Sequence, residues 1–68
     1  MAKTNRLREI RESLGVTQDD LWQATGVGLA TLSRIENDHV VPRSLTRKKI
    51  AHALGVPMKM IWPVRPPR

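Results

Sequence analysis

One stretch of the sequence, residues 17–37, constrains the fold of this chain more than any other. Thr17 is a good N-cap for a helix, and Gly26–Gly28 predicts a tight turn. An apolar repeat of helical spacing resumes after that turn. We therefore expect one short helix over Gln18–Ala24 and a second over Leu29–Asn37, joined by the turn. The outer face of the second helix would be free to enter the major groove of duplex DNA.

The composition favours a single all-α domain. The chain has 68 residues, of which 40% are hydrophobic although Phe and Tyr are absent, so aliphatic contacts between helices suit it better than a β-rich core. It has no cysteine and no Cys/His cluster at metal spacing, so we expect no disulfide framework, no metal site and no cofactor. We place a compact five-helix domain in residues 1–62 and an extended, proline-rich basic tail in residues 63–68.

A further helix is predicted before the opening stretch, over Asn5–Leu14, with Thr4 as its N-cap and Gly15 at its end. The apolar spacing of the successive helices predicts which residues face the core. These residues are Leu7, Ile10, Leu14, Leu21, Ala24, Val27, Leu32, Ile35, Ile50, Ala53 and Leu54.

Two helices are predicted after a loop over residues 38–45. Thr46 caps the first of them, and Leu45 packs on Ile50 as a hydrophobic staple. The last helix is short, with Pro57 in its first turn and Pro63 just beyond its end.

The charge distribution indicates an anionic partner. The net charge is +6 and the pI is near 11.3. Residues 1–14 carry four basic and two acidic side chains, residues 15–38 one basic and four acidic, and residues 39–68 seven basic and none acidic. Nucleic acid is the favoured partner of such a chain. No apolar run is long enough to cross a bilayer, so no membrane partner is predicted, and we expect a cytoplasmic protein that associates with the nucleoid.

Several linked motifs resemble the phage repressor, Cro and xenobiotic-response-element family of lambda-repressor-like helix-turn-helix domains. The resemblance covers residues 5–61 and rests on these segments: Leu7–Arg11, Leu14–Gln18, Leu21, Thr25–Val27, Thr31–Asn37 and Ile50–Val56. It implies that Gln18 contacts the DNA backbone and braces the recognition helix. It also implies a structural ion pair between Arg11 and Glu36.

The sequence departs from the family pattern inside the helix-turn-helix. Trp22 stands where a small residue is usual because the two helices cross closely there. Either the two helices cross at a wider distance, or the Trp22 ring turns aside. The ring would then either fill a gap in the structure or act as a surface anchor for a partner. Gly28 replaces the usual Ser or Thr cap, and Leu29 and Ala30 stand where many relatives carry polar base-reading residues.

Four outward residues of the predicted recognition helix are candidate base contacts: Leu29, Ala30, Ser33 and Arg34. Leu29 and Ala30 offer only apolar contact with thymine methyl groups, whereas Arg34 can bind guanine with two hydrogen bonds or hold a phosphate. Seven residues are candidate contacts to the DNA backbone: Gln18, Gly28, Thr31, Asn37, Arg43, Arg47 and Lys48. The alternative role of Asn37 is the C-cap of the helix. The alternative for the basic residues is that they form a solvated helix face without contact to DNA.

The sequence favours a transcriptional regulator, more specifically a repressor, that binds a palindromic operator as a homodimer. Met58, Met60 and Trp62 are candidate dimer contacts, or they complete the core of the monomer. The alternative is a protein-interaction module, such as an antitoxin or a phage-encoded inhibitor, anchored by Leu29, Ala30 and Trp22.

A third hypothesis, nonspecific nucleic-acid binding, accounts for the charge but not for the helix-turn-helix spacing. His39 and His52 are interpreted as surface residues, and no catalytic constellation is predicted, so we do not expect an enzyme.

Overall fold

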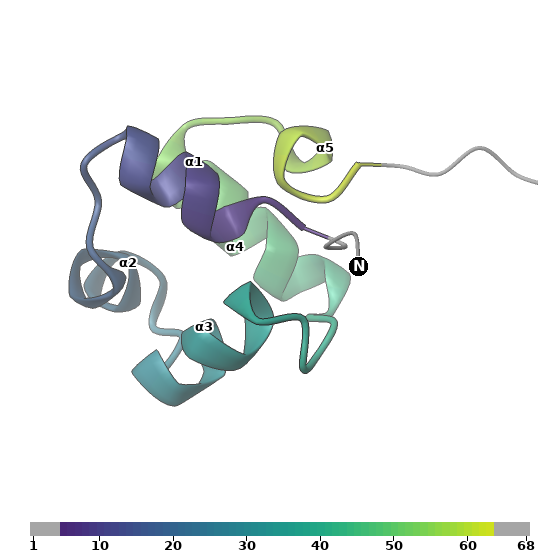
Figure 1. Cartoon of the computed structure of the whole chain (residues 1–68), viewed down its shortest axis with the longest axis horizontal. Helices are drawn as coiled ribbons and strands as arrows, with labels where there is room; N and C mark the ends of the chain where they lie inside the picture. Colours follow the sequence, from purple (N-terminus) through teal and green to yellow (C-terminus); the bar gives the residue numbers. More distant parts are fainter. Residues whose placement is uncertain (1–4, 64–68) are drawn as a thin grey trace, which may run out of the picture.

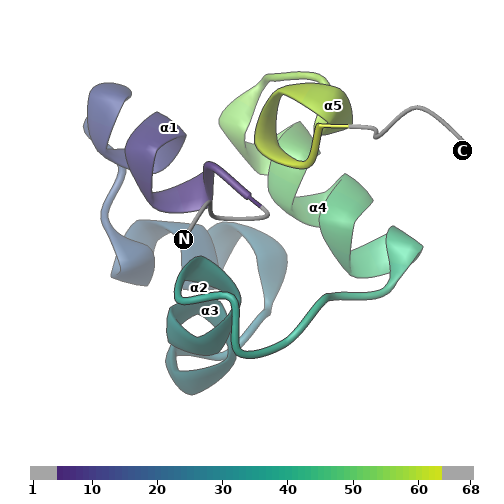
Figure 2. The ribbon, with the colours of Figure 1, turned by 45° about the vertical axis from the view of Figure 1, so that its right-hand side comes forward.

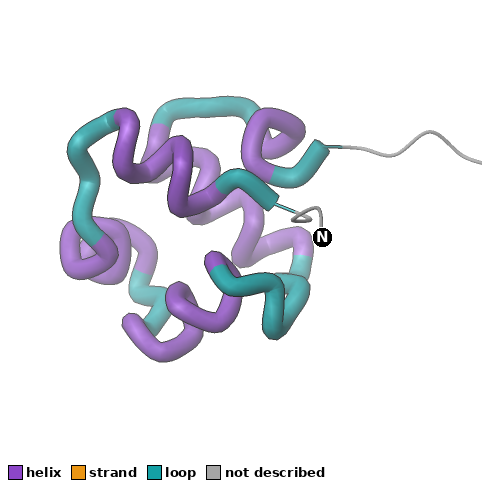
Figure 3. Tube along the Cα trace, in the orientation of Figure 1, coloured by secondary structure: helices purple, strands orange, loops and turns teal. Residues whose placement is uncertain are grey.

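The computed structural model describes residues 5–63 and consists of helices joined by loops, with no strand in that range (Figures 1 and 3). The predicted all-α, five-helix fold is confirmed. The helices are α1 (Leu7–Ser13), α2 (Gln18–Thr25), α3 (Leu29–Glu36), α4 (Ser44–Leu54) and α5 (Met58–Ile61). No helix in this range is long and apolar enough to span a bilayer. The predicted tail, beyond Pro63, and Thr4 lie outside the described residues.

The helices pack so that α3 lies at one edge of the domain. α2 packs against both α3 and α4, α1 packs against α3, and α4 packs against α5. In Figure 1 and in the turned view of Figure 2, α3 stays at the lower edge of the molecule and α5 at the upper edge. One long side of α3 is therefore left uncovered by the other helices.

All five helices contribute apolar side chains to a single core. Its buried members are Leu7, Ile10, Leu21, Leu32, Ile35, Ile50, Ala51, Leu54, Ile61 and Trp62. Val16, Val27, Val56 and Met58 are partly buried and pack against it. Each large aliphatic side chain buried in this way contributes about 1.5–3 kcal/mol, so a small domain without disulfides depends on these contacts.

The prediction of a core position is wrong for three residues, since Leu14, Ala24 and Ala53 are exposed. Leu14 is the C-cap residue of α1 and so no longer follows the helical repeat of that helix. In α4 Ile50 and Leu54 are buried as predicted, but the buried face extends to Ala51 on one flank instead of Ala53 on the other. Ala24 faces a shallow groove between α2 and α4, which Ala53 also lines.

The start of α1 is organised by Asn5 rather than by a helical first turn over Asn5 and Arg6. Asn5 is buried, and its Oδ1 accepts the Leu7 backbone N–H at 3.0 Å. Its Nδ2 donates to Ile35 O at 2.8 Å and to Asp38 Oδ1 at 2.7 Å. Asp38 has φ 60°, in the left-handed region, directly after α3. The Asn5 side chain therefore fixes the end of α3 against the start of α1.

The start of α4 also differs from the prediction. The helix begins at Ser44 with Arg43 as N-cap, so Thr46 lies inside the helix and does not cap it. Leu45 is exposed, and the predicted staple onto the fully buried Ile50 is wrong. Pro42 restricts the backbone of the residue before it, so it does not prevent a helix from beginning at Ser44.

The remaining helix ends differ by one residue from the predicted bounds. α2 continues to Thr25, and α3 ends at Glu36 with Asn37 as its C-cap. Pro57 is the N-cap of α5 rather than a residue of its first turn, and its carbonyl accepts the Met60 N–H at 3.0 Å.

Candidate nucleic-acid interface

The N-terminus of α2 is fixed by a capping box. Thr17 Oγ1 accepts the Asp20 backbone N–H at 3.0 Å, and Asp20 Oδ2 accepts the Thr17 N–H at 3.1 Å. The hydrogen bond from the Thr17 backbone, followed by that with its side chain, lowers the pKa of Asp20. Because both orphan donors are satisfied, Gln18 begins the helix in a defined orientation.

The turn between α2 and α3 is held by one glycine and one hydroxyl group. Gly26 adopts φ 77°, and its N–H donates to Trp22 O at 2.7 Å. The Thr25 hydroxyl donates to Leu21 O at 2.7 Å and accepts the Val27 N–H at 3.1 Å. The prediction of a left-handed conformation at Gly26 is confirmed. The sequence did not predict that the Thr25 hydroxyl group bridges Leu21 and Val27.

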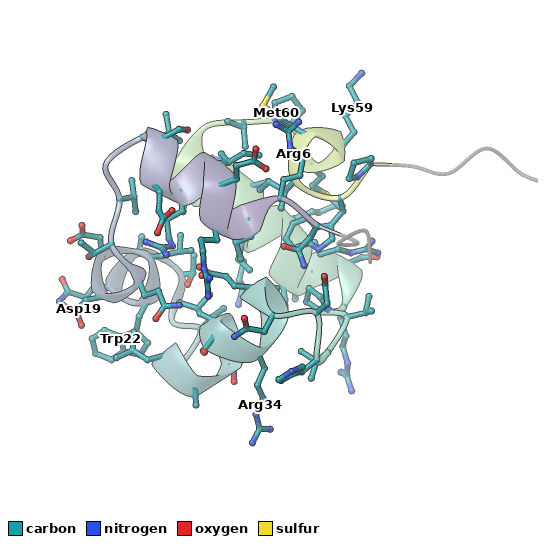
Figure 4. The ribbon with its side chains drawn as sticks, in the orientation of Figure 1. Arg6, Asp19, Trp22, Arg34, Lys59 and Met60 are labelled. Carbon is teal, nitrogen blue, oxygen red and sulfur yellow. The ribbon has the colours of Figure 1, made fainter. Side chains whose placement is uncertain are left out.

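The outward face of α3 carries the four candidate base contacts. Leu29, Ala30 and Arg34 are exposed, and Ser33 is half-buried. In Figure 4 the Arg34 side chain extends away from the body of the domain, at the edge formed by α3. Gly28 is the N-cap and supplies no side-chain cap, and a Cβ added there would meet open space. The first turn of α3 is therefore open to a ligand.

At its C-terminal end α3 carries a buried carboxylate that joins three helices. The Glu36 side chain is completely buried. Arg11 of α1 donates from Nε to Glu36 Oε2 at 2.7 Å and from Nη2 to Oε1 at 3.3 Å. Gln18 of α2 donates from Nε2 to the same Oε1 at 3.2 Å. The structure thus contains the Arg11–Glu36 ion pair, and it places Gln18 against the recognition helix.

Arg8 is a fourth member of this cluster that the sequence analysis missed. Its Nε donates to Glu36 Oε1 at 3.2 Å, and its Nη2 donates to Asn37 Oδ1 at 3.4 Å. Arg8 lies three residues before Arg11 and therefore on the same side of α1, which is the signal that could have found it. The Asn37 amide also donates to Ser33 O at 2.9 Å.

The electrostatics of the cluster stabilise the charged forms of both partners. Burial by itself would raise the pKa of Glu36, but hydrogen bonds from Arg11, Arg8 and Gln18 and the positive charge of Arg11 outweigh it, so the pKa is lowered. The hydrogen bond to Glu36 is the largest influence on Arg11, and its pKa is raised. Glu36 is therefore an anion within the fold and holds α1 and α2 in place against α3.

A family model described as helix-turn-helix matches residues 7–61, the same segment that forms this five-helix arrangement. The chain belongs to the Cro/C1-type helix-turn-helix family. Members of this family are DNA-binding transcriptional regulators. The chain is also similar to the HTH-type transcriptional repressor RghR of Bacillus subtilis (strain 168), with 43% identity over 53 residues. The match covers 76% of this chain and 39% of RghR, so the chain spans about two-fifths of the length of that relative.

The basic residues that follow α3 lie in different surroundings in this helix-turn-helix domain. Arg43 and Lys48 are exposed near the start of α4. Arg47 is half-buried, with Nη2 donating to Ser44 Oγ at 3.2 Å, and its Nε is buried without a hydrogen-bond partner in the described chain. Lys49 instead lines the groove between α2 and α4 together with His52.

The two histidines lie on the surface of the domain. Both His39 and His52 are exposed, as the sequence analysis expected. Within residues 5–63 no group of three or more histidine, cysteine or acidic side chains is arranged to hold a metal ion.

Trp22 turns aside from the crossing of the two helices. It keeps 42% of its surface exposed, so the interpretation of this residue as a filler of a gap is wrong. Figure 4 shows its side chain at the outer edge of the domain, near α2. This helix-turn-helix therefore carries a large aromatic group on its surface where the family pattern has a small residue.

The side chains of the three candidate dimer contacts differ in their exposure to solvent. Trp62 is only 9% exposed and belongs to the core, and Met58 is half-buried against that core. Met60 is 46% exposed. Trp62 thus completes the monomer, and Met60 is the candidate whose side chain is open to a partner.

Proposed function

We propose that this chain is a sequence-specific repressor of transcription that inserts α3 into the major groove of an operator. The observation that carries the proposal is that Leu29, Ala30 and Arg34 are exposed on α3, a helix that Glu36 fixes against α1 and α2. A rigid helix with an open outer face is what base recognition in a groove requires. The repressor RghR, to which the chain is similar, supports the direction of regulation.

In this proposal the residues that contact DNA divide into two roles. Base edges are contacted by Leu29, Ala30 and Arg34, which are exposed, and by Ser33, which is half-buried beside Arg34. The contacts to phosphates come from the flanking positions: Gln18, Gly28, Thr31, Asn37, Arg43, Arg47 and Lys48. Gln18 is at the N-terminus of α2, where the helix dipole adds a favourable potential for a phosphate.

The operator is a palindrome bound by a homodimer. Two domains related by a twofold axis place their recognition helices in successive major grooves about 34 Å apart. Met60 on α5 supplies an apolar side chain for the contact between the two copies. The protein acts in the cytoplasm, at the nucleoid.

Selection from a randomised duplex library tests this function. The purified protein is incubated with the library at about 0.15 M salt, where nonspecific phosphate binding is weakened, and the retained duplexes are sequenced. We expect a palindromic sequence to be enriched. Binding that only weakens as salt rises, with no enriched sequence, would overturn the proposal.

The same selection, repeated with variants of two exposed arginines, tests whether α3 makes the base contacts. Arg34→Ala should relax the preference at one position of each half-site, because a bidentate contact to guanine discriminates by about 1–3 kcal/mol. Arg6→Ala is the matched control, since Arg6 is exposed near α5, at the opposite edge of the domain (Figure 4). It should leave the selected sequence unchanged.

A further inference from the structure

Arg8 of α1 is less fully neutralised by its partners than the neighbouring Arg11. Arg11 Nε lies 2.7 Å from Glu36 Oε2, and Arg11 Nη2 lies 3.9 Å from the exposed Glu12. Arg8 Nε contacts the other carboxylate oxygen, Glu36 Oε1, at 3.2 Å. That oxygen also accepts hydrogen bonds from Arg11 at 3.3 Å and from Gln18 at 3.2 Å. Because one oxygen serves three donors, the Arg8 guanidinium keeps much of its positive charge uncompensated.

The Arg8 side chain is also open to a ligand. It is 43% exposed, whereas the Glu36 side chain is completely buried. A guanidinium has five N–H donors, of which Arg8 uses one on Glu36 and one on Asn37 Oδ1, at 3.4 Å. The other three N–H groups have no partner within residues 5–63. Glu36 and Asn37 therefore orient the guanidinium without exhausting its donors.

This guanidinium lies between the two ends of the helix-turn-helix. Gln18 begins α2, and Asn37 is the C-cap of α3. Arg8 Nε and Gln18 Nε2 both lie 3.2 Å from Glu36 Oε1, so these two nitrogens are no further apart than twice that distance. Since Arg8 also contacts Asn37, donors from three helices meet at one place on the surface.

The two amides at this place are incomplete ligands for a phosphate by themselves. Gln18 gives one amide hydrogen to Glu36, and Asn37 gives one to Ser33 O at 2.9 Å, so each amide has one hydrogen left. Neither amide carries a charge. Hydrogen bonds from a cation to a phosphate are about twice as strong as neutral ones, and a planar guanidinium can bind two phosphate oxygens at once. Arg8 supplies the cation that the two amides lack.

We propose that Arg8, Gln18 and Asn37 form one binding site for a DNA phosphodiester, with Arg8 as its cation. The inference rests on the proposed function and extends the DNA contact to α1, a helix outside the helix-turn-helix. The buried Glu36 holds the Arg8 guanidinium in place before DNA binds, which reduces the entropy that a long side chain loses on binding. The two arginines thus differ in role: Arg11 ties the helices together, and Arg8 binds the ligand.

Neutralisation of single phosphates tests this site. Methylphosphonate linkages, which are uncharged, are placed one at a time along each half-site of the selected operator. At one linkage the original protein should lose about tenfold in affinity, whereas Arg8→Gln should lose much less at that linkage. Arg6→Gln is the matched control, because Arg6 is exposed at the start of the same helix and pairs with Glu9 at 3.2 Å. It should keep the tenfold loss.

A contact can be separated from a purely structural role of Arg8. In Arg8→Gln the bonds from Arg11 and Gln18 to Glu36 remain, so urea unfolding should stay close to that of the original protein. If Arg8 only supported Asn37 or Glu36, Arg8→Gln would weaken binding while every methylphosphonate penalty stayed as in the original protein. That pattern would overturn the proposal.

The salt dependence of binding gives a second readout that needs no operator, because phosphate contacts also operate on nonspecific duplexes. On a duplex of arbitrary sequence, Arg8→Gln should reduce the magnitude of the salt slope by about 1, and Arg8→Lys, which keeps the charge, should restore it. A slope that Arg8→Gln leaves unchanged would overturn the site even if an operator is enriched. A reduced slope without any enriched operator would overturn the proposed function and leave the site in place, so the two failures are distinguishable.

Discussion

Arg11 and Glu36 form the closest contact between charged side chains in the described chain, with Arg11 Nε 2.7 Å from Glu36 Oε2. The Glu36 side chain is completely buried, and that of Arg11 is 10% exposed. Arg11 Nη1 also donates to Val16 O at 2.8 Å, in the loop before α2. One ion pair therefore fixes α1, the loop and α3 relative to one another.

Replacement of Glu36 should strongly destabilise the domain. Glu36→Gln leaves the buried Arg11 charge without its partner, and breaking a buried pair in this way costs about 3–5 kcal/mol. Urea unfolding followed by circular dichroism measures the change. Glu9→Gln is the control: Glu9 pairs with Arg6 on the surface, where an ion pair contributes about 1 kcal/mol or less. A similar loss in both variants would contradict a special role for the buried pair.

The same cluster predicts how stability depends on pH. The pKa of Glu36 is lowered from an ordinary value of 4.5, so the folded state favours the carboxylate. A group with a depressed folded pKa contributes stability that is present above its unfolded pKa and is lost as pH falls through its folded pKa. We therefore expect this contribution to be complete at neutral pH and to disappear only below pH 4.5. Carboxyl carbon NMR should show Glu36 titrating below 4.5; titration at or above that value would contradict the prediction.

Two glycines next to the turn should respond in opposite directions to substitution. Gly28 has φ −59° and open space around it, so Gly28→Ser adds an N-cap to α3 and reduces the freedom of the unfolded chain, with a gain of about 0.5–1 kcal/mol. Gly26→Ala should cost about 1 kcal/mol or more, because φ 77° is unfavourable for a residue with a Cβ. Thermal unfolding compares the two variants, and a loss of stability in Gly28→Ser would contradict the prediction.

Local signals in the sequence were sufficient to predict α2, the turn and α3. Thr17 and Gly26 act on backbone groups within a few residues, so their roles can be read without knowledge of the tertiary structure. The predicted start of α4 was wrong because Thr46 resembles an N-cap locally, whereas the helix begins at Ser44 after Arg43, which caps it without a side-chain hydrogen bond.

Other features depend on partners that are distant along the chain. Asn5 is fixed by Ile35 and Asp38, and Arg8 by Glu36 and Asn37, so neither has a local pattern that reveals its role. The direction of the Trp22 ring likewise depends on how closely α2 and α3 pack. The resemblance to the family predicted the Arg11–Glu36 pair because that contact belongs to the shared motif.

Lys48 should contribute to DNA binding without contributing to sequence preference. In the proposed complex it neutralises one phosphate, so Lys48→Ala should weaken binding similarly for all sequences and reduce the magnitude of the salt slope by about 1. Fluorescence anisotropy at several salt concentrations measures that slope. Lys59→Ala removes the same charge from α5, at the opposite edge of the domain, and should leave the slope unchanged (Figure 4). Equal effects of the two variants would indicate a general charge effect instead of a positioned contact.

Met60 should control assembly on the operator rather than folding. Because its side chain is 46% exposed in the single chain, Met60→Glu removes little of the core, and urea unfolding of the variant should stay close to that of the original protein. The added charge would repel its counterpart across a twofold interface, so binding to a palindrome should fall toward the affinity for one half-site. Val41→Glu places the same charge at another exposed apolar residue and is the control. Cooperative binding that survives in Met60→Glu would place the dimer contact elsewhere than α5.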